Sequence, residues 1–146
     1  MSPDSTLTDR WTQTAAGLMH ARVSGDLSGQ GRARVVLVHG LVISSRYMVP
    51  TALAFAPLCP VGAVDLPGYG DSAKPRTFLR IEGLADALVA WMDALGLQSA
   101  HWIGNSFGCQ ILADLALRHP DRVNRFVLQG PTVDPQARTV RHRWAS

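Results

Sequence analysis

A Gly-x-Ser-x-Gly pattern, in which Gly104 and Gly108 flank Ser106, constrains the fold of this chain more than any other feature. Residues 100–103 before it form a short apolar run typical of a buried strand, and residues 109–118 after it are typical of a helix. A sharp turn from strand to helix crowds neighbouring segments, so the two glycine positions must lack bulk. The sequence therefore predicts a strand, a tight turn and a helix, with the serine projecting from the end of the strand.

This serine has two interpretations, a catalytic nucleophile or part of a structural glycine-rich turn. The amino end of a helix suits a nucleophile, because its free N–H groups and the helix dipole stabilise developing negative charge. The five-residue pattern also arises by chance, so it does not distinguish the two interpretations by itself.

A second motif ends the apolar run at residues 34–41, which is typical of a strand buried on both faces of a parallel sheet. The run closes on His39 and Gly40, and the loop beyond them offers the backbone N–H of Leu41. An oxyanion hole takes two such donors, one from the residue after the nucleophile and one from an earlier strand–helix loop. The N–H groups of Phe107 and Leu41 are the two candidates. A core strand that ends in a turn is the simpler interpretation, and it holds in either case.

A third segment, residues 61–75, runs from a short strand into a loop rich in glycine and proline. Three signatures therefore stand in a fixed order: the His-Gly pair at residues 39–40, the loop at residues 65–72, and the Gly-x-Ser-x-Gly turn. In these motifs and in their order the chain resembles the α/β-hydrolase family.

The resemblance extends to residues 126–132, which are similar to the family's next strand and loop, and it covers roughly residues 19–135. It implies that Ser106 is a nucleophile and that His39 is structural or supports the oxyanion loop. Relatives of this fold that act as dehalogenases or epoxide hydrolases use aspartate at the nucleophile position, so the serine argues against those reactions.

Residues 68–73 also match the dinucleotide-binding fingerprint, which is the main rival interpretation. That fingerprint must open a helix, so that the pyrophosphate can bind free N–H groups. Here Pro75 disfavours helical angles at Lys74, and no helical pattern resumes until about residue 78. Two strands also precede the pattern where the dinucleotide fold has one. The sequence has no phosphate-binding loop motif either, so nucleotide binding has no support.

Strands and helices alternate along the chain, which predicts an α/β fold with a mostly parallel sheet and helices on both faces. Residues 19–23 are an early strand, and residues 44–57 form a first helix in which Pro50 must lie in the first turn or cause a kink. The clearest helix spans residues 81–95, and Gly96 is placed to end it. Its apolar residues recur at helical spacing and are most simply core contacts: Leu84, Leu88, Trp91, Met92 and Leu95.

The chain divides into three parts by this interpretation. Residues 1–15 are polar and expected to be loose, residues 16–136 form a partial α/β-hydrolase core domain, and residues 137–146 are a tail where a cap helix would begin. The family pattern continues with a cap, further strands and a late histidine. We therefore expect an amino-terminal part of the fold, truncated before the cap and the last strands.

Composition excludes several other classes of protein. With 47% apolar and 17% charged residues, no signal pattern and no apolar run of membrane-spanning length, the chain is expected to be a cytoplasmic domain that does not bind membranes. Cys59 and Cys109 stand in apolar surroundings and are expected to be reduced. The net charge of +3 is mild, and the arginines after residue 117 are spread out with few aromatic residues among them, so no nucleic-acid binding is expected. No metal-ligand spacing is present, so we expect no metal and no organic cofactor.

The catalytic base is the missing part. In the family the triad runs serine, acid, histidine along the chain, and only His119 and His142 follow the serine. His119 ends the helix that starts at the turn, roughly 20 Å from the hydroxyl, and His142 lies in an arginine-rich tail. His20 and His39 precede the turn, and neither is a convincing base.

The acid has one candidate, Asp134, because some members of the family carry it after the strand that here spans residues 126–130. The alternative is a turn aspartate before proline.

The predicted function is hydrolysis of ester-like acyl bonds in small molecules through an acyl-Ser106 intermediate. The base is missing from this chain, and so is the acid if Asp134 is only a turn residue. The alternative is a non-catalytic or degenerate binding module of the same fold. A truncated sheet also predicts self-association through its open edge.

Overall fold

A six-stranded sheet forms the centre of the protein in a computed structural model that describes residues 6–28 and 32–131. The strands lie in the order β1-β2-β4-β3-β5-β6. Their bounds are β1 Thr8–Thr14, β2 Gly17–Ser24, β3 Val35–Val38, β4 Val61–Val64, β5 Ala100–Asn105 and β6 Val123–Gln129. The helices are η1 Ser45–Met48, α1 Val49–Phe55, α2 Ile81–Leu95, α3 Phe107–Arg118 and the short η2 Pro120–Arg122.

The sheet is mostly parallel, as the sequence predicted. Strands β4, β3, β5 and β6 run parallel to their neighbours, whereas β1 and β2 form an antiparallel hairpin that pairs with β4. The hairpin corrects one expectation, because residues 8–14 form strand β1 where a loose segment was predicted. The strand is polar and largely exposed, so it has no apolar pattern to reveal it, and pairing with β2 along its whole length stabilises it.

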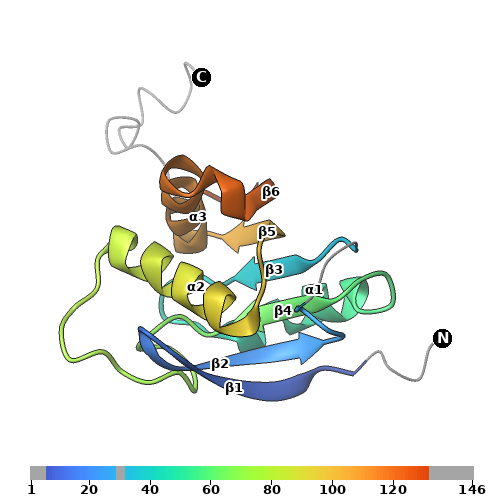
Figure 1. The fold of residues 1–146 in the computed structure, drawn as a ribbon, viewed down its shortest axis with the longest axis horizontal. Coiled ribbons are helices and arrows are strands. Elements are labelled where there is room, and N and C mark those ends of the chain that lie inside the picture. Colours follow the sequence, from blue (N-terminus) through green and yellow to red (C-terminus); the bar gives the residue numbers. More distant parts are fainter. Residues whose placement is uncertain (1–5, 29–31, 132–146) are drawn as a thin grey trace.

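Helices cover both faces of the sheet. In Figure 1, α2 and α3 lie in front of the strands and α1 lies behind them. Val36 and Val38 of β3 pack with residues of α2 and α3, whereas Val35 and Leu37 pack with residues of η1 and α1. Successive side chains of a strand point to opposite faces, so β3 contributes to both cores. The α/β fold class predicted from the alternating pattern is confirmed.

Two helices show how local sequence sets element bounds. Helix α2 spans the predicted residues and ends at Gly96, which is left-handed with φ 71° and donates its N–H to carbonyl oxygens of the last turn. Trp91 and Met92 of this helix are fully buried core residues, as predicted. The helix predicted over residues 44–57 is divided into η1 and α1, because Pro50 stands in the first turn of α1 and a new helix begins there.

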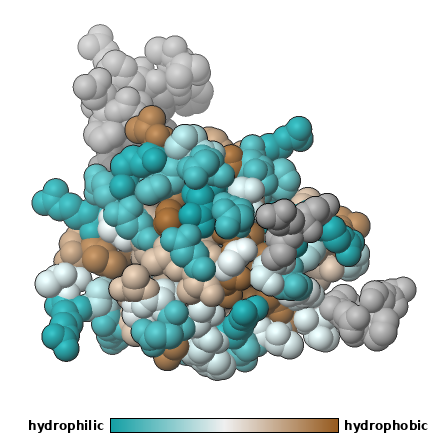
Figure 2. Space-filling model, viewed as in Figure 1, coloured by the Kyte–Doolittle hydropathy of each residue, from teal (hydrophilic) through white to brown (hydrophobic). Residues whose placement is uncertain are grey.

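The visible face of the molecule and the β6 edge of its sheet differ in the side chains that they expose. The face seen in Figure 2, which α2 and α3 cover, carries mostly hydrophilic side chains with apolar ones scattered between them. Strand β6, at the edge of the described sheet, is exposed along most of its length.

Cys59 and Cys109 are both free thiols. Within the described residues, no helix has the length and apolarity needed to cross a membrane. The expected tail at residues 137–146 lies outside the described residues.

Candidate functional site

Ser106 lies at the turn between β5 and α3, in the strand–turn–helix arrangement that the sequence predicted. Its backbone has φ 52° and ψ −114°, and among the described residues only Val42 is another non-glycine with positive φ. Such a conformation costs about 1–3 kcal/mol and persists only where neighbouring structure holds it. Here the Ser106 N–H donates to the carbonyl oxygen of Gln129 (2.9 Å), and its own carbonyl accepts from the N–H of Cys109 (2.9 Å).

The two glycines beside the serine allow this turn to pack against its surroundings. A Cβ atom on Gly108 would stand 2.5 Å from the carbonyl oxygen of Val38 at the end of β3. A Cβ atom on Gly104 would stand 2.9 Å from Cδ1 of Leu112 and 3.0 Å from the backbone of Gly108. A side chain at position 108 would therefore displace the backbone, and one at position 104 would force Leu112 or the turn to shift. The amino end of α3 packs directly on the carboxyl end of β3.

His39 organises the loop after β3. Its side chain is buried, Nδ1 lies 2.8 Å from the carbonyl oxygen of Gly40, and Nε2 lies 3.1 Å from the N–H of Leu66. Because Leu66 can only donate, Nε2 accepts, and the ring proton resides on Nδ1, which donates to Gly40. Burial lowers the pKa of His39, although the Gly40 hydrogen bond and the Asp65 charge oppose this shift. His39 is therefore a neutral structural residue.

This hydrogen bond also orients the next peptide. The C=O of Gly40 and the N–H of Leu41 belong to one planar trans peptide and point in opposite directions. With the carbonyl turned toward His39, the Leu41 N–H points away from the imidazole. Gly40 also packs on the turn, since a Cβ atom there would stand 3.2 Å from both Cβ of Ser106 and the carbonyl oxygen of Asn105.

Leu41 and Phe107 share one cleft, although they are far apart in the sequence. The cleft has a volume of about 330 Å³ and is lined by both residues, by the loop after β4 and by the segment that leads into α2. Phe107 is also the first residue of α3, where backbone N–H groups have no acceptor within the helix. The remaining lining residues are mostly apolar, and Arg76 is the one charged residue among them: Pro67, Gly68, Tyr69, Pro75, Arg76, Thr77, Phe78, Leu79 and Leu84.

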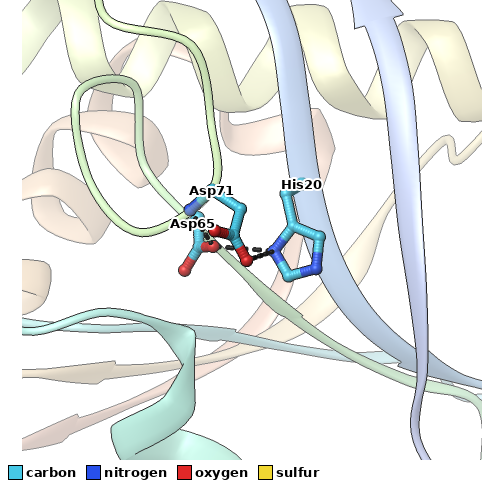
Figure 3. Close-up of side chains that lie close together, drawn as sticks. All are labelled: His20, Asp65 and Asp71. Carbon is cyan, nitrogen blue, oxygen red and sulfur yellow. Dashed lines mark hydrogen bonds and ion pairs between the residues drawn. The ribbon is translucent and has the colours of Figure 1, made fainter.

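The sequence analysis missed a buried network beside this cleft, which Figure 3 shows. His20 of β2 is fully buried and contacts Asp65, which is 1% exposed, across 2.7 Å between Nδ1 and Oδ2. Potential ligand atoms of His20, Asp65 and Asp71 lie within 4.8 Å of one another. The direct contact of the first two occupies the space between them, so we interpret the cluster as hydrogen-bonded and not as a metal site. No local pattern predicted it, because its members come from β2, from the end of β4 and from the loop after β4.

The other residues considered for catalysis either lie away from the Ser106 turn or are not among the described residues. His119 ends α3 and lies 3.4 Å from Asp86 of α2. His20 and His39 each have both ring nitrogens in hydrogen bonds. Asp134 and His142 lie outside the described residues. Among the described histidines, none is shown in contact with Ser106.

Comparison with known proteins identifies the family. The model of the alpha/beta hydrolase fold matches residues 33–145, which are most of the chain. The chain belongs to the α/β-hydrolase family. The match includes the strands and loops that form the Ser106 turn, the His39 loop and the cleft.

Individual relatives of this chain differ in the reaction that their names give. RutD of Caulobacter segnis, assigned by inference as a carbamate hydrolase, is 36% identical over 100 residues, which are 67% of this chain and 38% of RutD. The pimeloyl-[acyl-carrier protein] methyl ester esterase of Vibrio cholerae is 37% identical over 101 residues, which are 69% of this chain and 37% of the esterase.

A solved structure supports the same fold. The haloalkane dehalogenase DatA of Agrobacterium tumefaciens superimposes with a TM-score of 0.75 at 28% identity, over 86% of this chain and 42% of DatA. The chain thus spans about two fifths of the length of the relatives and structures that it matches. Family membership shows the α/β-hydrolase fold, and the names of these relatives give different reactions.

Proposed function

We propose that the protein is a serine hydrolase of ester-like acyl bonds, or the amino-terminal part of one, with Ser106 as the nucleophile. The observation that carries this proposal is the strained backbone of Ser106 at a strand–helix turn, next to a cleft that Leu41 and Phe107 line. Strain at a non-glycine residue held by neighbouring structure is common at functional sites. A purely structural turn has no need of a serine in this conformation.

The proposed reaction begins when the Ser106 hydroxyl oxygen attacks the carbonyl carbon of the substrate and gives its proton to a base. The N–H groups of Leu41 and Phe107 stabilise the oxyanion that forms. The leaving group departs with a proton and leaves an acyl-serine ester. Water then attacks this ester, which releases the acid and restores the serine hydroxyl.

We propose that the base lies outside the described residues, because His20, His39 and His119 are engaged elsewhere and His101 stands at the end of β5 away from Ser106. Asp134, by its position after β6, is the candidate acid. Relatives such as the methyl ester esterase of Vibrio cholerae support an ester substrate. Without a base, turnover of an activated ester should be slower by on the order of 10³-fold or more, with residual activity from the oxyanion donors.

Labelling with a fluorophosphonate probe tests the proposal directly, since the probe bonds covalently to an activated serine. Labelling should be slow, by on the order of 10³-fold, while the base is missing, so the incubation is long. At its end we expect intact mass to show one label per chain, and peptide mapping to place it on Ser106. The variant Ser106→Ala should lose the label, whereas Ser99→Ala, at a partly buried serine before β5, should keep it. Equal labelling of wild type and Ser106→Ala would contradict the proposal.

A second candidate function is a non-catalytic binding module. The engagement of every described histidine beside the cleft favours it, because a hydrolase of this kind needs a free base. Such a module would bind a small apolar ligand in the cleft with the same affinity in wild type and Ser106→Ala, and it would not react with the probe.

A further inference from the structure

His20 makes two short contacts with carboxylates from different parts of the chain. Its Nδ1 lies 2.7 Å from Oδ2 of Asp65, and its Nε2 lies 2.8 Å from Oδ1 of Asp9 in β1. An ionised carboxylate only accepts hydrogen bonds, so each contact requires a proton on the imidazole nitrogen. An imidazole that donates from both nitrogens is an imidazolium, and the side chain of His20 has both contacts while it has no exposed surface.

Asp65 is the ionised partner on the buried side. Burial raises the pKa of its carboxyl group, but the hydrogen bonds from the Asp71 N–H, from Ser45 and from His20 more than offset this, so the pKa lies below its ordinary value. The N–H of Ser45 lies 2.7 Å from Oδ1, and the N–H of Asp71 lies 2.9 Å from Oδ2. Gly70 allows this approach, because a Cβ atom there would overlap the carboxylate.

The same carboxylate thus joins two loops that border the cleft. Ser45 ends the loop that contains Leu41, and Asp71 lies in the loop whose residues 67–69 line the cleft. A second hydrogen-bonded link runs from the backbone of β2. The backbone N–H of His20 donates to Oγ of Ser72 (2.9 Å), and that hydroxyl donates to the carbonyl oxygen of Asp65 (2.6 Å). Side chain and backbone of His20 therefore hold one loop, and through Asp65 they reach the other.

We infer that His20 is a positioning residue. It is an imidazolium that acts through Asp65 and fixes the position of the loop at residues 39–45 relative to the loop at residues 65–73. Its effect on catalysis rests on the proposed function, because it acts by placing the Leu41 N–H beside Ser106. Its effect on the two loops does not depend on that function.

The electrostatic surroundings of His20 suit this charge. Asp9 and Asp65 face its two nitrogens, Asp71 lies 4.0 Å from Nδ1, and the Trp11 ring lies 4.8 Å away between centroids. Arg22 of β2 is the nearby positive group, 3.3 Å from the Asp9 carboxylate.

Nitrogen NMR of the unmodified chain tests the charge without any substitution. Near neutral pH we expect two ring N–H signals from His20, both protected from exchange with water. A single ring N–H near neutral pH, with both carboxylates ionised, would overturn the inference.

Variants test the positioning role. His20→Gln should shift the amide signals of Ser45, Asp71 and Leu41 and slow probe labelling of Ser106 by about tenfold, the effect of about 1.4 kcal/mol. The matched control His101→Gln, on β5, should do neither. If His20→Gln folds poorly, the double variant His20→Gln/Asp65→Asn should melt closer to wild type than either single variant, because it removes both buried charges together. Unshifted amides in His20→Gln would overturn the inference.

The outcomes separate the two proposals. A wild-type chain that never labels at Ser106 contradicts the proposed hydrolase, while the NMR signals still decide the role of His20. A chain that labels normally in His20→Gln, with unshifted loop amides, keeps the hydrolase and removes the positioning role.

Discussion

Strands β3 and β6 have similar apolar character but opposite environments. All four residues of β3 are buried, and the strand has a parallel partner on each side and helices on both faces. In β6, the side chains of Phe126, Val127 and Leu128 are 43%, 54% and 38% exposed, and the strand pairs only with β5 among the described residues. An apolar run thus predicts that a segment favours burial, whereas its neighbours decide whether it is buried.

The contrast separates two regions: the interlocked loops at the carboxyl ends of β3, β4 and β5, which we call the finished region, and the exposed β6 edge, which we call the open edge. At the carboxyl ends of β3, β4 and β5, loops are tied to one another by His39, Asp65 and the Ser106 turn. On the other side, an apolar hollow of about 430 Å³ lies between α1 and the β5–β6 edge, lined in part by Phe55, Leu58 and Phe126. Exposed apolar area of this kind marks an interaction surface. The following predictions test whether substitutions in the two regions differ in their effect on the free energy of unfolding, as the regions differ in packing.

The largest effect is expected from Gly108→Ala in the finished region. The new Cβ atom would stand 2.5 Å from a backbone oxygen of β3, so the strand or the helix must move. We expect a loss of about 4 kcal/mol in the free energy of unfolding, or no folded protein. The matched variant Gly130→Ala, beyond β6, meets no atom within 4 Å and has φ 54°, so it should cost about 1 kcal/mol. Urea unfolding measures both, and equal losses would remove the contrast.

Truncation of one leucine in each strand is expected to give the next largest difference. Leu37→Ala in β3 empties a fully buried position and should cost about 3 kcal/mol. Leu128→Ala in β6 removes a side chain that is already 38% exposed and should cost about 1 kcal/mol or less. Thermal and urea unfolding of the pair check this, and similar losses would show that β6 is covered in solution.

Acid should weaken the finished region through His39. Its pKa in the folded chain lies below the ordinary value of a histidine, because burial disfavours the imidazolium. The unfolded chain therefore binds more protons on acidification, so stability is complete above that value and declines as pH falls toward the folded pKa. The loss should be smaller in His39→Asn. Urea titrations at several pH values measure the slope, and identical slopes in both proteins would exclude His39 as the source.

The smallest effect on stability is expected from Val127→Lys at the open edge. This side chain is 54% exposed, so the free energy of unfolding should change by about 0.5 kcal/mol or less. We expect the wild type to self-associate through the β6 edge, and a lysine there should reduce that association. Sedimentation velocity over a range of concentrations tests it. A wild type that stays monomeric throughout contradicts this expectation.

Local patterns predicted much of the fold. The period of apolar residues and the terminal glycine of α2 gave its bounds, and the Gly-x-Ser-x-Gly turn was recognisable because strand, glycines and helix are consecutive. The hairpin strand β1 was missed, because Thr8–Thr14 is polar and exposed and forms only by pairing with β2. The His20–Asp65 contact was missed for a similar reason, since 45 residues separate its partners.

The sequence by itself determined the family, the alternation of strands and helices, and the tight turn at Ser106, because these depend on residues that are neighbours along the chain. Only the tertiary structure decided the neutral state of His39, the charged pair of His20 with Asp65, and the cleft shared by Leu41 and Phe107. Hydrogen-bond partners and burial set these properties, and both come from segments that meet only when the sheet has formed.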